Sequence, residues 1–218
     1  MRGSGFLAIW SDIERGALTD YRHWLTREHT TERVMTKGFL ASRVFRADRS
    51  DVDRFFILYE LETSEVLDGP AYLARLNAPT PWSQRIMPQL GNFIRGGGII
   101  AARAGRGEGS TIAALRIEHL PKQSKQLADA VVSLDGIAAV QIGATDLERT
   151  TVPTVEKGMR RQEGLFAGLF IIEALDQISL RGALGRMAKI APEVIQGVAD
   201  PEIYQSIFAL DARTASLD

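Results

Sequence analysis

A glutamate and a histidine that could transfer protons stand side by side at Glu28 and His29. Counted at helical spacing, they continue an apolar stripe that begins at Leu18, so they fall on a face that should be buried. Because a buried carboxylate is costly unless it is paired, this position favours a general acid–base pair in which His29 moves the proton and Glu28 orients or tunes it. The alternative is that Glu28 and Glu32 form ion pairs on a solvated face and that His29 is a helix-end residue.

A second segment, residues 77–88, could hold a negatively charged substrate. Thr80 is a natural N-cap and Pro81 suits the first helical position, so a short helix is predicted to begin there. Trp82 and Arg85 then lie one turn apart on the same side, where an arginine beside an aromatic plane could bind a carboxylate or an enolate. A capped helix whose Trp82 packs in the core is the structural alternative.

Three further side chains are candidates for substrate binding, namely Trp24, Arg43 and Tyr59. Trp24 lies on the predicted first helix, four residues before Glu28. Arg43 interrupts an apolar run on a predicted strand, so it either faces a pocket or extends its guanidinium to solvent from a strand edge. Tyr59 could line a ligand cavity, although a core aromatic residue would give the same pattern.

The composition excludes several classes of site. The 218 residues include no cysteine, which excludes disulfides, iron–sulfur clusters, cysteine zinc sites and thiol nucleophiles. Lys and Arg number 26 and Asp and Glu 27, so the net charge of -1 gives no support for nucleic-acid binding. Glu28, His29 and Glu32 have the spacing of metal ligands but lack a clear further ligand, and the glycine-rich stretches lack the context of a phosphate loop. We therefore expect neither a metal nor an organic cofactor.

The sequence gives no indication of a membrane segment. No apolar run approaches the ~20 residues of a membrane span, and the residues after Met1 lack the apolar region of a signal peptide. A cytoplasmic protein without a membrane partner is the expectation. A chain of 218 residues suits one compact domain or two small ones.

The elements that must position these residues follow the same order in both halves of the chain. The first half predicts strands at 5–11, 39–47, 54–62 and 92–103, and helices at 12–36, 69–76 and 81–87. Residues 104–110 have the composition of a linker. The second half predicts strands at 111–118, 137–144, 164–174 and 203–210, and helices at 122–134 and 179–190. The segment 150–162, which contains Glu156, Lys157, Arg160 and Arg161, is expected to be a long, charged loop, with a lid as the alternative.

Faint sequence similarity supports a tandem repeat. Residues 38–48 align with 136–146, and residues 56–60 align with 169–173. The order strand, helix, strand, strand, helix, strand is the ferredoxin-like motif, whose helices cover one face of an antiparallel sheet. We therefore predict an α+β fold of two ferredoxin-like repeats, 1–104 and 110–218, with the apolar outer faces of their sheets packed together as a barrel.

The first half resembles the dimeric α+β barrel superfamily, near its EthD-like and antibiotic-biosynthesis-monooxygenase-like branches. The resemblance covers most of residues 5–103 and rests on three patterns: Y-x-x-W-x-x-x-E-H-x-x-E-R at 21–33, L-Y-E-L at 58–61 and T-P-W-x-x-R at 80–85. In that superfamily two ferredoxin-like units form one barrel, within a chain or between chains, and the ligand usually lies between the sheet and the helices. The resemblance implies a site in the first half, near His29, Glu28, Trp82 and Arg85, with a degenerate second half as its structural partner.

Members of that superfamily include cofactor-free monooxygenases, isomerases, decarboxylases, dehydrochlorinases and haem enzymes. The leading hypothesis is a cofactor-independent enzyme, an isomerase, decarboxylase or lyase, that transfers protons on a small aromatic or carbonyl-containing acid held by Arg85 or Arg43. A monooxygenase activity also remains open. The alternatives are a non-catalytic small-molecule binding or stress protein, and a haem protein with His29 as axial ligand. A homodimer is expected, because an exposed sheet edge invites pairing.

Overall fold

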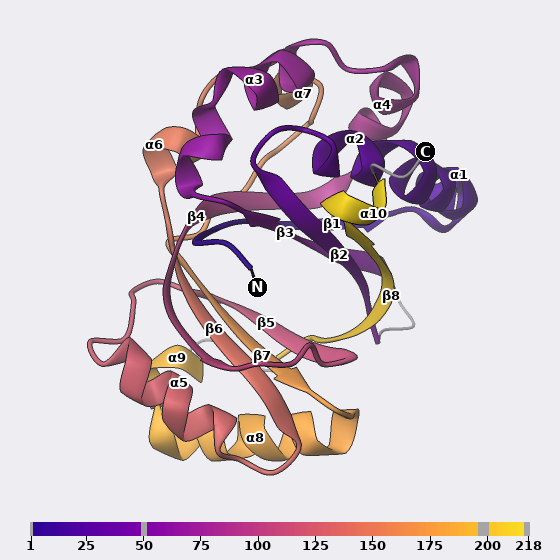
Figure 1. Ribbon diagram of the computed structural model, residues 1–218. Helices are drawn as coiled ribbons and strands as arrows, with labels where there is room; N and C mark the ends of the chain where they lie inside the picture. The colour runs from indigo at the N-terminus through magenta and orange to yellow at the C-terminus, as the bar shows by residue number, and fades with distance from the viewer. Residues whose placement is uncertain (1, 49–51, 196–200, 216–218) are drawn as a thin grey trace. The chain divides into compact units, whose positions relative to one another are not determined.

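The computed structural model describes residues 2–48, 52–195 and 201–215 (Figure 1). The chain divides into two compact units: the first comprises residues 1–99, 146–165 and 207–218, and the second comprises 100–145 and 166–206. The first unit is therefore built from three separate stretches of the chain. One of them, hereafter the 146–165 segment, lies in the sequence between two strands of the second unit.

The first unit contains a four-stranded antiparallel sheet. Its strands are β1 (Gly5–Ile13), β2 (Phe39–Ala47), β3 (Asp53–Leu61) and the first part of β4 (Gly91–Gly105). The strand order is β4-β1-β3-β2. Leu7 lies opposite both Tyr59 and Gly97, so these residues share one face of the sheet. That face packs on Tyr21, Trp24 and Leu25 from the helices and forms the apolar core of the unit.

Short helical segments cover this face of the first unit. From the first half of the chain come the 3-10 helices η1 (Arg15–Ala17), η3 (Ser64–Asp68) and η4 (Met87–Gln89), the π-helical turn η2 (Leu25–His29), and the α-helices α1 (Leu18–Trp24), α2 (Thr30–Val34), α3 (Pro70–Asn77) and α4 (Pro81–Ile86). From later in the chain come α6 (Leu147–Thr150), α7 (Val155–Gly158) and α10 (Ala212–Ala215). Figure 1 shows α7 beside α3, and α6 packs against η3.

The second unit repeats the plan with its own sheet. Its strands are the last part of β4 together with β5 (Thr111–Ile117), β6 (Ile137–Thr145), β7 (Gly168–Ala174) and the start of β8 (Ile203–Asp211). The pairings give the order β6-β7-β5-β8, all antiparallel. Numbered within each repeat, both sheets therefore run 4-1-3-2, which is the ferredoxin-like order. The helices are α5 (Ser124–Val132), α8 (Gln177–Ile190) and α9 (Pro192–Ile195), and α5 and α8 lie against the same face of this sheet (Figure 1).

The predicted elements are confirmed with two corrections. The first helix was predicted to begin at residue 12, but β1 continues to Ile13 and the α-helix begins at Leu18. Ser11 is consequently a buried strand residue, whose hydroxyl lies 3.3 Å from the hydroxyl of Tyr21. The segment 150–162, predicted as a loop, begins with Thr150, the last residue of α6, and contains the helix α7.

A glycine turn that is common to both repeats explains part of the sequence similarity. Gly38 and Gly136 both have positive φ, 93° and 71°, and each directly precedes the second strand of its repeat. The carbonyl of Gly38 accepts the N–H of Glu62, and the carbonyl of Gly136 accepts the N–H of Leu175, both at 2.9 Å. Each turn thus fixes the start of one strand against the end of the next, and only glycine reaches this conformation without strain.

We expect Gly38→Ala to destabilise the protein by about 1–3 kcal/mol, because its Cβ would force a strained backbone and overlap the side chain of Val66. The measurement is the free energy of unfolding from urea titration. Gly16→Ala is the matched control, since a Cβ at Gly16 meets no atom within 4 Å, and its effect should stay within about 0.5 kcal/mol. Equal effects of the two substitutions would contradict the prediction.

Candidate functional site

The first long helix changes its winding where the candidate acid–base pair lies. Between α1 and α2, the N–H of Thr30 donates to the carbonyl of Leu25, five residues earlier, which closes the π-helical turn η2. Such turns are rare, occur singly within α-helices and are frequent at functional sites. His29 is the last residue of this turn.

The π turn decides which residues of the helix are buried. Tyr21, Leu25, His29 and Arg33 are buried, at steps of four residues. In a regular α-helix, a step of four residues rotates about 40° past a full turn. Residues at steps of four would therefore move gradually to another face of the helix. The π turn has more residues per turn, so it compensates for part of this rotation. The buried face therefore passes through His29 and Arg33, whereas Glu28, predicted to lie on it, is half-buried.

The imidazole of His29 lies inside the first unit, with 4% of its surface exposed. It stacks on the indole of Trp24, with ring centroids 4.2 Å apart and planes inclined by 28°. Its Nδ1 is buried and has no hydrogen-bond partner among the described residues. Burial, and then the nearby charges of Arg33 and Arg160, lower the pKa of His29 well below its usual 6.5, so the ring is neutral at physiological pH.

Arg33 carries a charge at the centre of this region. Its Nη2 lies 2.7 Å from both carboxylate oxygens of Glu156, and its Nη1 lies 3.3 Å from Glu32. Burial alone would lower the pKa of Arg33, but the charge of Glu156 raises it overall. Glu156 comes from α7 in the 146–165 segment, 123 residues further along the chain.

Two more buried arginines complete what we call the arginine cluster, namely Arg33, Arg95 and Arg160. The guanidinium carbons of Arg33 and Arg95 lie 5.7 and 6.0 Å from the centre of the Tyr72 ring. Arg95 donates to the carbonyl of Thr150 at 2.9 Å and to the hydroxyl of Tyr72 at 3.4 Å. Arg160 pairs with Glu163 at 2.6 Å and lies over the ring of Phe93 at 4.2 Å.

Tyr59 lies on the helix-facing side of β3, as a cavity-lining residue would. Its hydroxyl is buried and makes no hydrogen bond within the described residues. Burial raises the pKa of Tyr59 far above its usual value against the opposing charge of Arg33, so the phenol keeps its proton. Arg33 thus acts electrostatically on two buried polar groups without partners, the imidazole of His29 and the phenol of Tyr59.

Three of the predicted residues instead connect α4 to α1 and η2. The carboxylate of Glu28 accepts the hydroxyl of Thr80 at 2.6 Å. Trp82 donates its indole N–H to Asp20 at 3.0 Å, and the exposed Arg85 binds both oxygens of Asp20 at 3.0 and 3.1 Å. Arg85 therefore already holds an anion, at the surface of the helices.

The structure does not bring Arg43 to His29. Arg43 lies opposite Leu58 in the sheet, so it occupies the face that Tyr59 and the helices do not share. Trp24 does join His29, through the ring stack, and its indole N–H donates to Ser83 at 3.1 Å. Of the predicted residues, His29, Trp24 and Tyr59 therefore lie on the core side of the first unit.

Sequence reasoning missed the residues that surround His29. Arg33 was considered as an ion-pair partner on a solvated face and as part of the resemblance, Glu156 and Arg160 were named only as charged residues of the 150–162 loop, and Arg95 was not singled out. The available signal was Arg33 itself, because it lies four residues after His29 on the same helix. Its carboxylate partner in the 146–165 segment carries no local signal in the sequence.

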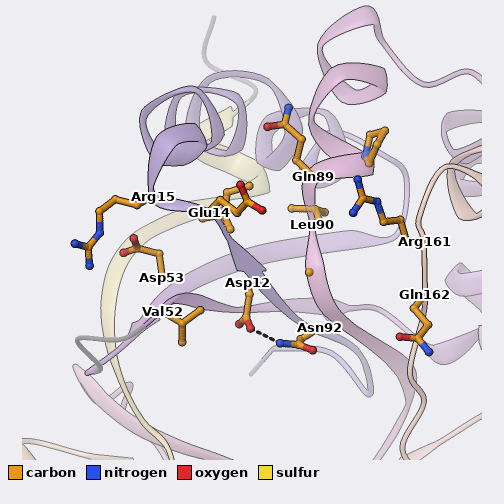
Figure 2. Close-up of a pocket in the computed structure, with 13 residues that line it drawn as sticks. Asp12, Glu14, Arg15, Val52, Asp53, Gln89, Leu90, Asn92, Arg161 and Gln162 are labelled. Carbon is orange, nitrogen blue, oxygen red and sulfur yellow. Dashed lines mark hydrogen bonds between the residues drawn. The ribbon is translucent and has the colours of Figure 1, made fainter.

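The large cavities lie away from His29. One pocket of about 810 Å³ in the first unit opens between the end of β1 and the starts of β3 and β4. Figure 2 shows Arg161 and Gln162 bordering one side of it and Arg15 and Asp53 the other. Its Asp12 is already paired, because it accepts from Asn92 at 2.6 Å and from two nitrogens of Arg54, and its Asp53 pairs with Arg46. Glu14 also lines this pocket and is exposed.

Two other cavities differ in size and lining. The second unit has a pocket of about 1220 Å³ beside His119, between the end of β5, α5 and the end of α8. In the first unit, a void of about 10 Å³ lies under the 146–165 segment, which leaves room for one water molecule. Four cationic side chains line this void, Arg95, Arg149, Lys157 and Arg160, and its lining contains no carboxylate.

Within the described residues, no three His, Asp or Glu side chains are grouped as metal ligands would be. None of the helices in the described ranges is long and apolar enough to cross a membrane.

Comparison with known proteins shows the fold. No family model and no curated protein matches the chain. A candidate monooxygenase from Fusobacterium nucleatum subsp. nucleatum has a similar structure, with a TM-score of 0.50 and 13% identity, over 97% of this chain and 96% of that chain. An anthrone oxidase-like protein matches with a TM-score of 0.53 and 13% identity, over 97% of this chain and 94% of that one. Together with the 4-1-3-2 strand order of both units, these likenesses show that the chain has a ferredoxin-like α+β fold.

Proposed function

We propose that this chain is a small-molecule enzyme that transfers protons on a carbonyl-containing or aromatic acid, with its site between the first helix and the sheet of the first unit. The observation that carries the proposal is the pair of buried, unpartnered polar atoms, Nδ1 of His29 and the hydroxyl of Tyr59. Most buried polar groups have a hydrogen-bond partner, so two exceptions beside one buried arginine mark a site built for another molecule.

His29 is the base in this proposal. A neutral imidazole can accept a proton, and the lowered pKa of His29 keeps it in that form. The stack on Trp24 fixes the plane of the ring. Removal of a proton from a carbon next to a carbonyl leaves negative charge on the carbonyl oxygen. Return of that proton to a neighbouring carbon gives isomerisation, and the same anion forms when a neighbouring carboxylate is lost as carbon dioxide.

Tyr59 and Arg33 stabilise that developing charge. The phenol of Tyr59 keeps its proton and has no acceptor within the described structure, so it can donate to the carbonyl oxygen as charge forms there. Arg33 supplies positive charge beside both groups. The site needs no metal and no organic cofactor for this chemistry, and Arg33 takes the anion-holding part that the sequence suggested for Arg85 or Arg43.

Entry of a substrate requires movement of the 146–165 segment. Glu156 of this segment is paired with Arg33, and Arg160 contributes to the charge around His29. When such a segment closes over a bound substrate, it excludes water, and this strengthens the electrostatic interactions inside the site. A cytoplasmic homodimer remains the expected state of the protein.

A haem does not fit at His29 in this arrangement. The imidazole is 4% exposed, and none of the three cavities described above has His29 in its lining, so they offer no space for a macrocycle beside its ring nitrogens. We derive no step through haem, and an absorbance spectrum of the purified protein tests this alternative directly.

The proposal predicts deuterium uptake into a substrate analogue. In D₂O, the protein should accelerate exchange at the carbon next to the carbonyl of phenylpyruvate, and His29→Gln should slow this exchange about 10²–10⁴-fold. Proton nuclear magnetic resonance measures the exchange. His23→Gln, on the same helix but part-exposed, is the control and should keep the wild-type rate. Binding of phenylpyruvate without any exchange would favour the non-catalytic binding alternative.

The depressed pKa of His29 also predicts a pH-dependent stability. Above about pH 7 the imidazole is neutral in both states. As the pH falls below 6.5, the unfolded chain binds a proton that the folded chain excludes, so the free energy of unfolding falls by up to about 1.4 kcal/mol per pH unit. The difference in unfolding free energy between wild type and His29→Gln, from urea titrations at pH 8 to 5, isolates this effect. A difference that does not change with pH would show that folding does not lower the pKa of His29.

A further inference from the structure

We propose that Glu156 occupies, in the closed protein, the place that the carboxylate of the substrate takes on Arg33. The inference rests on the proposed function and names its substrate class: a carboxylic acid whose carbonyl group lies within two or three bonds of the carboxylate. Glu156 is then an internal competitor, and the helix α7 that carries it is released when substrate binds.

The contact has the geometry of a bound carboxylate. Both oxygens of Glu156 lie 2.7 Å from Nη2 of Arg33, and the carboxylate is 1% exposed. Arg160 lies 3.8 Å from the same carboxylate. A free carboxylic acid could make each of these contacts, because they involve only the carboxylate group.

The helix that carries Glu156 is weakly attached by other means. α7 has four residues, and Glu156 is the one residue of it that is buried. Val155, next to it, is 48% exposed and contributes a backbone hydrogen bond of 3.0 Å to Asn77. α7 is thus held mainly by the charge of Glu156, which an added carboxylate can replace. A helix held by apolar packing would instead lose the free energy of that packing when it is released.

The surrounding charges favour an additional anion. Four cations lie here, Arg33, Arg95, Lys157 and Arg160, and they face three carboxylates, Glu32, Glu156 and Glu163. Arg95 is 4% exposed, and its hydrogen bonds go to a carbonyl and a phenol. A buried guanidinium without a carboxylate is costly. The void beside it adds leucine side chains, Leu67, Leu73 and Leu76, which suit the apolar part of an acid.

The position of Arg33 sets the distance from the carboxylate to the reacting carbon. Arg33 follows His29 by one turn on the same buried face, and one turn of α-helix rises about 5.4 Å. Arg33 also lies close enough to His29 for its charge to act on the imidazole, so an acid anchored on Arg33 carries the atoms next to its carboxylate into the neighbourhood of His29. This spacing selects acids with a nearby carbonyl over longer ones.

The test compares the benzoate affinity of two variants, in each of which one glutamate is replaced by glutamine. Glu156→Gln removes the internal charge with almost no change of shape, so it should bind benzoate at least tenfold more tightly than wild type in isothermal titration calorimetry. Glu163→Gln is the matched control, since Glu163 pairs with Arg160 and Lys157 and its loss should change the affinity by less than threefold. Benzamide, the neutral analogue, should bind all three proteins equally within twofold.

Three results would overturn the inference: no tenfold gain in Glu156→Gln, an equal gain in Glu163→Gln, or no benzoate binding by any of the proteins. If Glu156→Gln does not fold, hydrogen exchange in the wild type decides. Saturating benzoate should then accelerate amide exchange in residues 155–158 at least tenfold and leave α5 unchanged, and unchanged or slower exchange in 155–158 would contradict displacement.

The outcome is separable from that of the proposed function. Tighter benzoate binding by Glu156→Gln, with no His29-dependent exchange of phenylpyruvate, would keep the carboxylate site and reject the proton transfer. His29-dependent exchange without tighter binding would reject the displacement of Glu156 alone.

Discussion

A guanidinium that is buried in a protein requires a compensating charge or hydrogen-bond acceptors, and this requirement organises the first unit around Arg33. The charge cannot be left alone without a loss of about 3–5 kcal/mol. Glu156 meets the requirement from the 146–165 segment, and the same segment supplies the carbonyl of Thr150 to Arg95. The placement of this segment follows from arginines that the sheet and the first helix hold away from water, and the charge of Arg33 adds to the burial that keeps His29 neutral.

The order of elements and the fold class could be read from the sequence, because alternating apolar residues and glycine turns act locally. Gly38 and Gly136 show this well, since one backbone requirement recurs in both repeats. The candidate site was predicted less completely. A regular helical period places Glu28 and Glu32 on the buried face, but the π turn at Leu25–His29 shifts that face to His29 and Arg33. The contact of Arg33 with Glu156 joins residues 123 positions apart, and local patterns contain no information about it.

The two repeats keep one framework and differ in what their first helices bury. In the second repeat, α5 buries Leu127, Ala128 and Val131, all of them apolar. In the first repeat, the corresponding helix buries His29 and Arg33 in addition to its apolar residues. The second repeat still contributes to the surroundings of Arg33. The 146–165 segment follows β6 and precedes β7 in the sequence, but it belongs to the first unit.

The discontinuous first unit has a consequence for synthesis on the ribosome. Domains generally fold as they emerge, starting from the N-terminus. Here residues 1–99 emerge well before Glu156 and Thr150, so the nascent first unit has Arg33 and Arg95 but not the groups that receive their hydrogen bonds. The early chain must keep these side chains hydrated and its helices loosely docked. Completion of the first unit therefore waits for residues 146–165 and then for residues 207–218, so the first of the two similar parts of the sequence cannot be completed before the second has been synthesised.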